Sequence, residues 1–249
     1  MRLFLHEVRG ELLLYIRSRE LAFFTFLLPI LFVVILGSAY GDEEIEGHLG
    51  ADYLVSGMIG YGVASTAFAG LAIVLVIRRE EGILKRLRAT PLPAVTYISA
   101  VLGTTLIAFL VGAVCIVALA MTLFGAHFPK SPVSLLAALL LGGASFAAIG
   151  VAVTTFLHRA EGASAAINAV YIPLSFLSGA FFSQGGFPTL LTVVADVFPL
   201  RYFIDLISAI SLDGKQIWER PVDVAVIAAW GLAGTAFALR RFRWVPRGG

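Results

Sequence analysis

Charged residues are scarce in this sequence. Of its 249 residues, 14% are Asp, Glu, Lys or Arg and 59% are hydrophobic, whereas a typical soluble domain has about 25% charged residues. So few charges cannot cover the surface of a soluble protein of this length, so the composition indicates an integral membrane protein. There is one cysteine, Cys115. It excludes an internal disulfide, and we expect it to be a small buried side chain.

Lys and Arg are absent from six long apolar segments. Each segment is long enough for a transmembrane helix, which needs about 20 mostly apolar residues. We therefore predict an all-α integral membrane protein that forms a single domain over residues 1–249. The six predicted spans cover approximately residues 21–40, 54–77, 95–124, 133–157, 163–183 and 222–239.

The basic residues gather on one side of this topology. The N-terminus, the second and fourth loops and the C-terminus together hold 14 of the 18 Lys and Arg residues. Positively charged loops stay in the cytoplasm. We therefore expect a multi-pass protein of the plasma or inner membrane with both termini in the cytoplasm. The bases at that membrane face are suited to anionic lipid and do not indicate nucleic-acid binding.

Two further regions are predicted to be helical without crossing the membrane. Residues 1–19 fit an interfacial amphipathic helix, or alternatively a cytoplasmic extension of the first span. Between the last two spans, Pro188 and Pro199 divide an apolar stretch into pieces too short to cross a bilayer. These pieces predict a re-entrant helix pair or a simple extracellular hairpin, in which Arg201 can pair with Asp205. The apolar stripe of the N-terminal helix comprises Phe4, Leu5, Val8, Leu12, Tyr15 and Ile16, with Glu7, Arg9, Glu11 and Arg17 outside it.

The sequence contains no energy source and no catalytic motif. A GxxxxGK[ST] phosphate-binding loop is missing, as are HExxH and GxSxG. All 16 acidic residues lie in loops or near the ends of spans, Asp52 and Asp223 among them, whereas ion-coupled carriers place ionisable groups inside the membrane. We therefore expect no enzyme activity, and any uphill transport must draw its energy from a partner.

Three polar residues of the fifth span share one helix face. Asn168, Tyr171 and Ser175 are spaced i, i+3 and i+7. They could form hydrogen bonds between helices or line a substrate path, and their spacing fits both interpretations.

The densest group of charges lies between the second and third spans, in RREEGILKRLRATPLP (residues 78–93). Glu80 to Ala89 is compatible with a short helix, apart from Gly82, and Glu81 can pair with Lys85. The Thr90-Pro91 sequence then ends the helix, because the residue before a proline avoids the α region. We expect Ile83, Leu84 and Leu87 to form an apolar docking face and Glu81, Lys85 and Arg88 a charged one. An ordinary topogenic loop is the alternative.

This stretch resembles the cytoplasmic-loop motif of ABC-2-type permeases, the membrane subunits of ABC exporters. The matching residues are Glu80, Glu81, Gly82, Leu84, Leu87, Thr90, Pro91 and Leu92. Ile83 and Lys85 depart from the usual pattern and look like the drug- and antibiotic-export branch. The end of the fifth span also fits, with Pro173, Ser178-Gly179 and Phe181-Phe182 followed by Phe187-Pro188 and Phe198-Pro199-Leu200.

The resemblance implies an exporter of a lipophilic or amphipathic compound, such as a drug, antibiotic, lipid or glycan, in which the stretch is a coupling helix. Two permease subunits, expected to form a homodimer, would dock two copies of a P-loop subunit that binds ATP and Mg; this chain would bind no cofactor itself. The re-entrant pair, with Phe187, Pro188 and Pro199, would help to gate the exit. A membrane scaffold without a transport role is the alternative function. The coupling residues would be Glu80, Glu81, Gly82, Ile83, Leu84, Lys85, Leu87, Arg88, Thr90 and Pro91.

Overall fold

The computed structural model describes residues 2–17, 23–89, 94–157, 159–181 and 188–241. In chain order the elements are α1 (Arg2–Arg17), η1 (Phe23–Leu27), α3 (Leu28–Tyr40), β1 (Glu44–Ile45), β2 (His48–Leu49), α4 (Gly50–Ala64), η2 (Ser65–Gly70), α5 (Leu71–Glu80), α6 (Ile83–Arg88), α7 (Ala94–Phe124), α8 (Pro132–Val153), α9 (Ala160–Leu177), α10 (Thr189–Val197), α11 (Pro199–Ser211), η4 (Ile217–Glu219) and α12 (Pro221–Arg241). The mainly helical architecture that the sequence predicts is confirmed.

Four helices of the described chain are long and apolar enough to cross a membrane. They cover Gly50–Glu80, Thr96–Phe124, Pro132–Val153 and Pro221–Arg241. The first of these is one continuous helix made of α4, η2 and α5. α3 is apolar but has 13 residues, and α9 has 18 residues with Pro173 inside it. The first and fifth of the six expected spans therefore stay predictions.

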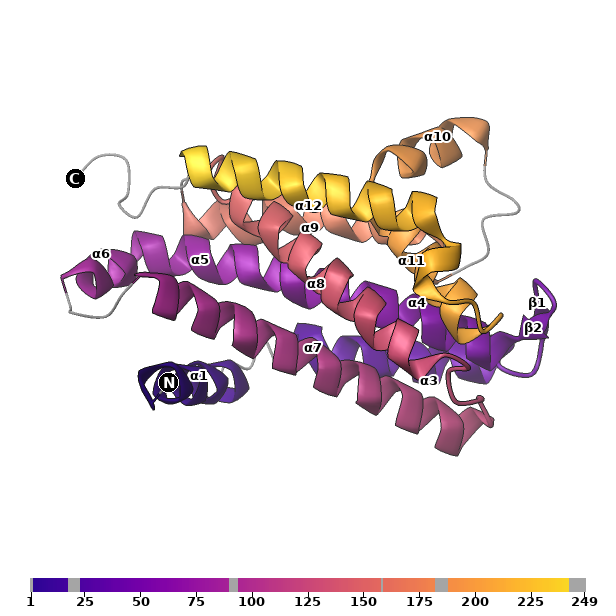
Figure 1. Cartoon of the computed structure of the whole chain (residues 1–249). Coiled ribbons are helices and arrows are strands. Elements are labelled where there is room, and N and C mark those ends of the chain that lie inside the picture. Colours follow the sequence, from indigo (N-terminus) through magenta and orange to yellow (C-terminus); the bar gives the residue numbers. More distant parts are fainter. Residues whose placement is uncertain (1, 18–22, 90–93, 158, 182–187, 242–249) are drawn as a thin grey trace.

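The helices form one elongated bundle with different structures at its two ends (Figure 1). α6 lies at one end of the bundle, the end at which α1 lies and α12 finishes. The β1–β2 hairpin lies at the opposite end, where Glu44 pairs with Leu49 and Ile45 with His48. We refer to these as the α6 end and the hairpin end.

The core of the bundle forms around glycines that leave room for aromatic rings. A Cβ atom at Gly142 of α8 would lie 2.1 Å from the ring of Phe203 on α11, and one at Gly143 would lie 2.5 Å from the ring of Phe109 on α7. The sequence predicts close helix approach at this glycine pair. The structure shows that side-chain rings, not helix backbones, occupy the space.

Two expectations about burial are wrong. Cys115 is exposed on α7, because it points away from the other helices. Glu11, which we expect on the polar side of the N-terminal helix, is buried at 9% exposure. α1 packs against α7 through Phe4 and Val8, which lie near Gly103, and the Glu11 carboxylate pairs with Arg78 of α5. Leu5 and Ile16 of the apolar stripe are exposed, and the interfacial position of the helix stays a prediction.

Candidate functional site

The α6 segment begins with a sharp change of direction. α5 ends at Glu80, and Gly82 follows with a positive φ of 70°. This left-handed conformation favours glycine, which has no Cβ atom to clash. Within the Glu80–Ala89 stretch, a turn at Glu81 and Gly82 therefore separates α5 from α6, at the glycine that the prediction left out of the helix. It also breaks the helical spacing of Glu81 and Lys85, which are both exposed and form no ion pair with each other within the described chain.

The side chains of α6 divide between the bundle and the outside. Leu84 is fully buried at 0% exposure and belongs to the hydrophobic core with Tyr97 and Leu75. Ile83 is half-buried, whereas Lys85 and Arg86 are exposed. Leu84 therefore holds α6 to its own chain. The side chains of Leu87 and Arg88, and the predicted stop at Thr90 and Pro91, lie outside the described residues.

Arg78 joins three helices just before the turn. Its two terminal nitrogens donate hydrogen bonds to the two carboxylate oxygens of Glu11 on α1, at 2.8 and 2.7 Å. One of them also donates to the hydroxyl of Tyr97 on α7, at 2.7 Å. The Arg78 and Glu11 side chains are 14% and 10% exposed. This bidentate, charge-assisted pair is among the stronger polar contacts that a protein can make.

Arg79 points to a different helix. It is 7% exposed and donates to the backbone carbonyl of Thr154, at 2.9 Å, and to that of Leu157. Both carbonyls follow the last turn of α8, where the carbonyl groups have no partner within the helix. The guanidinium of Arg79 therefore caps the end of α8.

Together the two arginines connect the base of α6 to α1, α7 and α8. The sequence places Arg78 and Arg79 among the loop bases. It did not identify Glu11 and Tyr97 as partners of Arg78. The available signal was Glu11 itself, an acid between apolar residues on the turn that follows Val8. Its partner lies 67 positions away, and no local pattern indicates a contact over that distance.

The polar residues of α9 are used mainly for helix packing. Tyr171 is 3% exposed, its hydroxyl donates to the backbone carbonyl of Tyr61 at 2.9 Å, and the two rings stack with centroids 5.3 Å apart. Ser175 is fully buried and donates to the carbonyl of Tyr171. Asn168 is half-buried and donates to Ser164 at 3.3 Å. For Tyr171 and Ser175 the contacts favour the packing interpretation over a substrate path.

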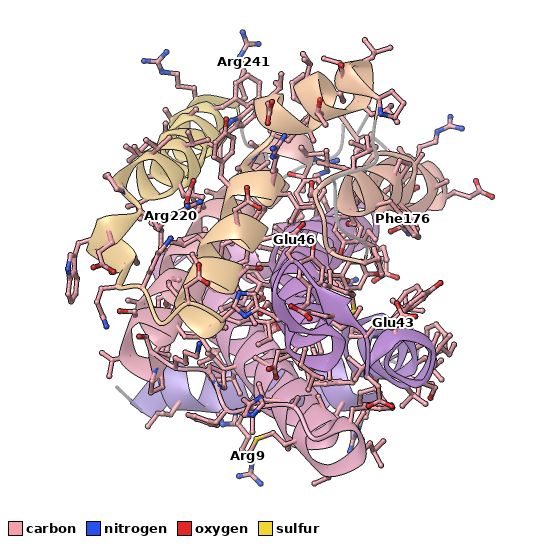
Figure 2. All side chains as sticks on the ribbon, turned by 90° about the vertical axis from the view of Figure 1, so that its right-hand side faces the viewer. Arg9, Glu43, Glu46, Phe176, Arg220 and Arg241 are labelled. Atoms are coloured by element: carbon pink, nitrogen blue, oxygen red, sulfur yellow. The ribbon has the colours of Figure 1, made fainter. Side chains whose placement is uncertain are left out.

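At the hairpin end, the expected gate residues lie around two short helices. Pro188 directly precedes α10, Pro199 is the buried first residue of α11, and Phe187 lies outside the described residues. Arg201 lies 3.8 Å from Asp205, which confirms the expected pair, and it also contacts Asp196. Figure 2 views the molecule from this end and shows Glu46 near the middle of the face and Arg220 to its left.

A polar cavity of about 390 Å³ opens between the hairpin and α11. Glu46, His48, Asp205, Asp213 and Arg220 are among its lining residues. Burial raises the pKa of the Asp205 carboxyl to about 6; Asp223 and Glu46 also raise it, and Arg201 and Arg220 oppose the shift. His48 lies 3.2 Å from Asp213. Across the described residues, no three His, Cys, Asp or Glu side chains gather in a way that could hold a metal ion.

The comparisons with known proteins agree with the motif at the α6 segment. Residues 2–212 match the family model described as ABC-2 type transporter. A search of curated proteins gave no match. The matched region includes α1, α6 and every helix up to α11, and therefore all of the contacts made by Arg78 and Arg79. The chain belongs to the ABC-2 type transporter family and is a membrane-spanning permease component of an ABC transporter.

Proposed function

We propose that this chain is the permease of an ATP-driven exporter, which moves a lipophilic or amphipathic compound out of the cell with energy from a separate ATP-binding subunit. The observation that carries the proposal is the attachment of α6 through Arg78 and Arg79. A loop that only fixed the topology would need exposed bases. It would not need one buried and one largely buried arginine bonded to three other helices.

The exposed charges near α6 are the surface offered to the partner. Glu81, Lys85 and Arg86 are exposed, whereas Leu84 is buried in this chain. Charged groups that are not paired within a protein steer association and select partners by complementarity. Members of this family generally work with an ATP-binding subunit. Two copies of it, carrying ATP and Mg, would serve a pair of permeases, for which a homodimer is the simplest arrangement.

The contacts at the base of α6 then define a route for movement. A displacement of α6 acts on the end of α5, from which Arg78 passes it to α1 and α7 and Arg79 passes it to α8. α5 also continues without interruption through η2 into α4. At 1.5 Å per residue, this 31-residue helix is about 46 Å long and reaches the hairpin end. The hairpin end, with α10 and α11, would open to release the substrate.

The substrate class follows from the interior of the bundle. All acidic residues lie in loops or near the ends of spans, so the membrane interior offers no charged group to bind an ion. An apolar compound or an amphipathic one with its polar part at the interface suits such an interior. This also fits the resemblance of the motif to the drug- and antibiotic-export branch.

The test is whether a charge at α6 decides the association with an ATPase. We expect Lys85→Glu to reduce the ATP-hydrolysing protein that co-purifies with the chain by roughly tenfold, as is typical when a complementary charge at an interface is reversed. Lys130→Glu is the matched control, because Lys130 is also exposed but precedes α8 at the hairpin end. Both variants should be inserted in the membrane in equal amounts. Equal co-purification of the ATPase with both variants, or full transport without any ATPase, would contradict the proposal.

A further inference from the structure

An apolar groove of about 630 Å³ lies beside the α6 end of the bundle. It is formed by α5, α6, α7, α8 and α12, with Leu75, Leu84, Val101, Phe109, Ala147 and Leu239 among its lining residues. In Figure 1, α7 and α8 lie close together toward the hairpin end and diverge toward the α6 end. Leu84 is the residue of α6 that lines the groove, and it is buried at the inner wall.

Hydroxyl groups in the wall of the groove already have hydrogen-bond partners within the protein. The hydroxyl of Thr105 donates to the carbonyl of Val101 on the same helix at 2.9 Å. The hydroxyl of Thr235 likewise donates to the carbonyl of Gly231 at 2.8 Å, and that of Tyr97 accepts from Arg78. Since these hydroxyls are already hydrogen-bonded, the groove suits an apolar occupant rather than water.

The groove opens sideways, out of the bundle. Leu102 is 38% exposed, Leu140 is 43% exposed and Leu239 is 83% exposed. All three belong to helices long and apolar enough to span the membrane. A groove of this kind that faces a bilayer is in contact with lipid acyl chains, which are therefore the occupants that can reach it without leaving the membrane.

Basic residues surround the end of this groove that is nearest to α6. Lys85 and Arg86 directly follow Leu84, and Arg240 and Arg241 directly follow Leu239; all four are exposed. Two acids, Glu80 and Glu81, lie in the same region, so the bases are in excess. A cluster of Lys and Arg beside a transmembrane helix attracts anionic headgroups with about 1 kcal/mol for each residue.

We propose that this groove is a binding site for an anionic phospholipid, with an acyl chain between α7 and α8 and the phosphate at the bases of α6 and of the last turn of α12. The site goes beyond the proposed export function, since it binds a lipid of the surrounding membrane without transporting it. In the orientation proposed above, it faces the cytoplasmic leaflet, where anionic lipids are concentrated. A bound lipid would fix the separation of α7 and α8 beside the contacts of Arg78 and Arg79.

The first test fills the groove. Ala144 and Ala148 line it on α8, so the double substitution Ala144→Phe/Ala148→Phe places two rings where the acyl chain would lie. Native mass spectrometry of the purified chain with phosphatidylglycerol should show the loss of a bound phospholipid. Ala229→Phe is the control, because Ala229 is exposed on α12 but does not line the groove. An unchanged number of retained lipids in the double variant would overturn the proposal.

The second test leaves the groove intact and therefore does not depend on the folding of the filled variant. Leu102→Trp places a fluorescent reporter at the groove edge, and the parent chain supplies the background of the natural tryptophans. Brominated phosphatidylglycerol should quench the reporter at a roughly tenfold lower mole fraction than brominated phosphatidylcholine. Adding Arg240→Gln/Arg241→Gln to the reporter chain should remove that preference. Equal quenching by the two lipids in the reporter chain would overturn the anionic selectivity.

Neither test uses ATP or a partner subunit, so each can fail or succeed independently of the export proposal. Lipid binding that is lost in the filled groove, together with normal ATPase association, would support both. Lipid binding that is unaffected by filling would remove the lipid site and leave the export proposal intact.

Discussion

The two ends of the bundle use charge in different ways. At the α6 end, Arg79 is buried and Arg78 largely so, and the two are bonded to Glu11, Tyr97 and the end of α8. At the hairpin end, most charged contacts have at least one more exposed partner: in the pair of His127 with Asp52, at 2.9 Å, the histidine side chain is 78% exposed. The pair of Arg220 with the buried Asp223 is the exception there. Buried pairs hold helices in one arrangement, whereas exposed pairs contribute little and break easily. This difference fits the proposal that the α6 end transmits movement and the hairpin end opens.

Removing the arginine at the α6 end should have the largest effect. Arg78→Ala leaves the Glu11 carboxylate buried without its counter-charge, which typically costs about 3–5 kcal/mol. We expect a correspondingly lower free energy of unfolding in detergent, with α1 released to protease. The double variant Glu11→Leu/Arg78→Met should recover most of the stability, because apolar side chains of similar size often replace a buried ion pair without loss.

That double variant also separates packing from transmission. We expect it to bind the ATPase normally yet to couple ATP hydrolysis poorly to transport, since the directional contact between α5 and α1 is gone. Wild-type coupling in a stable double variant would show that Arg78 only fills space.

Arg79→Ala should have a smaller and more local effect. Two carbonyls at the end of α8 lose their donor, and each unsatisfied buried group costs about 1–3 kcal/mol. Hydrogen exchange should become faster at the end of α8, around residues 154–157, and stay unchanged on α1. Arg78→Ala gives the opposite pattern, so the pair of variants distinguishes the two branches of the network. Faster exchange in both regions for both variants would mean that the network is not divided.

At the hairpin end, His127→Ala should change stability by no more than about 0.5–1 kcal/mol, as exposed ion pairs usually do. The backbone nitrogen of His127 also donates to Asp52, at 2.6 Å, and the substitution keeps that bond. Thermal unfolding of the parent and the variant measures the difference. A loss as large as that of Arg78→Ala would contradict the contrast between the two ends.

The smallest effect concerns pH. Burial raises the pKa of Asp205 to about 6, above the value of about 3.9 for an unfolded chain, so the folded state holds this proton more tightly. The resulting destabilisation is fully present above pH 6 and disappears as the pH falls through this window toward 4. Asp205→Asn should therefore remove a part of the pH dependence of unfolding between pH 4 and 7. A pH profile identical to that of the parent would contradict the assignment.

The sequence was sufficient to predict what depends on local patterns. The apolar segments predicted helices, and the charges between Arg78 and Pro93 identified the segment that contains α6. The prediction excepted Gly82 from the helix, but it did not indicate that Glu81 would join it in a turn or that α6 would begin only at Ile83. The contacts of Arg78 with Glu11 and of Arg79 with Thr154 depend on how helices distant in sequence pack together, which periodicity cannot indicate.

The most direct test of the central claim, that α6 receives an ATP-hydrolysing partner, is photo-crosslinking in intact cells. A photoreactive amino acid would replace Lys85 at α6 in one variant and Lys130 at the hairpin end in another. We predict that the variant at position 85 forms a covalent adduct with a protein that carries an ATP-binding phosphate loop. The variant at position 130 should form no adduct with such a protein. No adduct at position 85, or adducts there only with proteins that do not bind ATP, would contradict it.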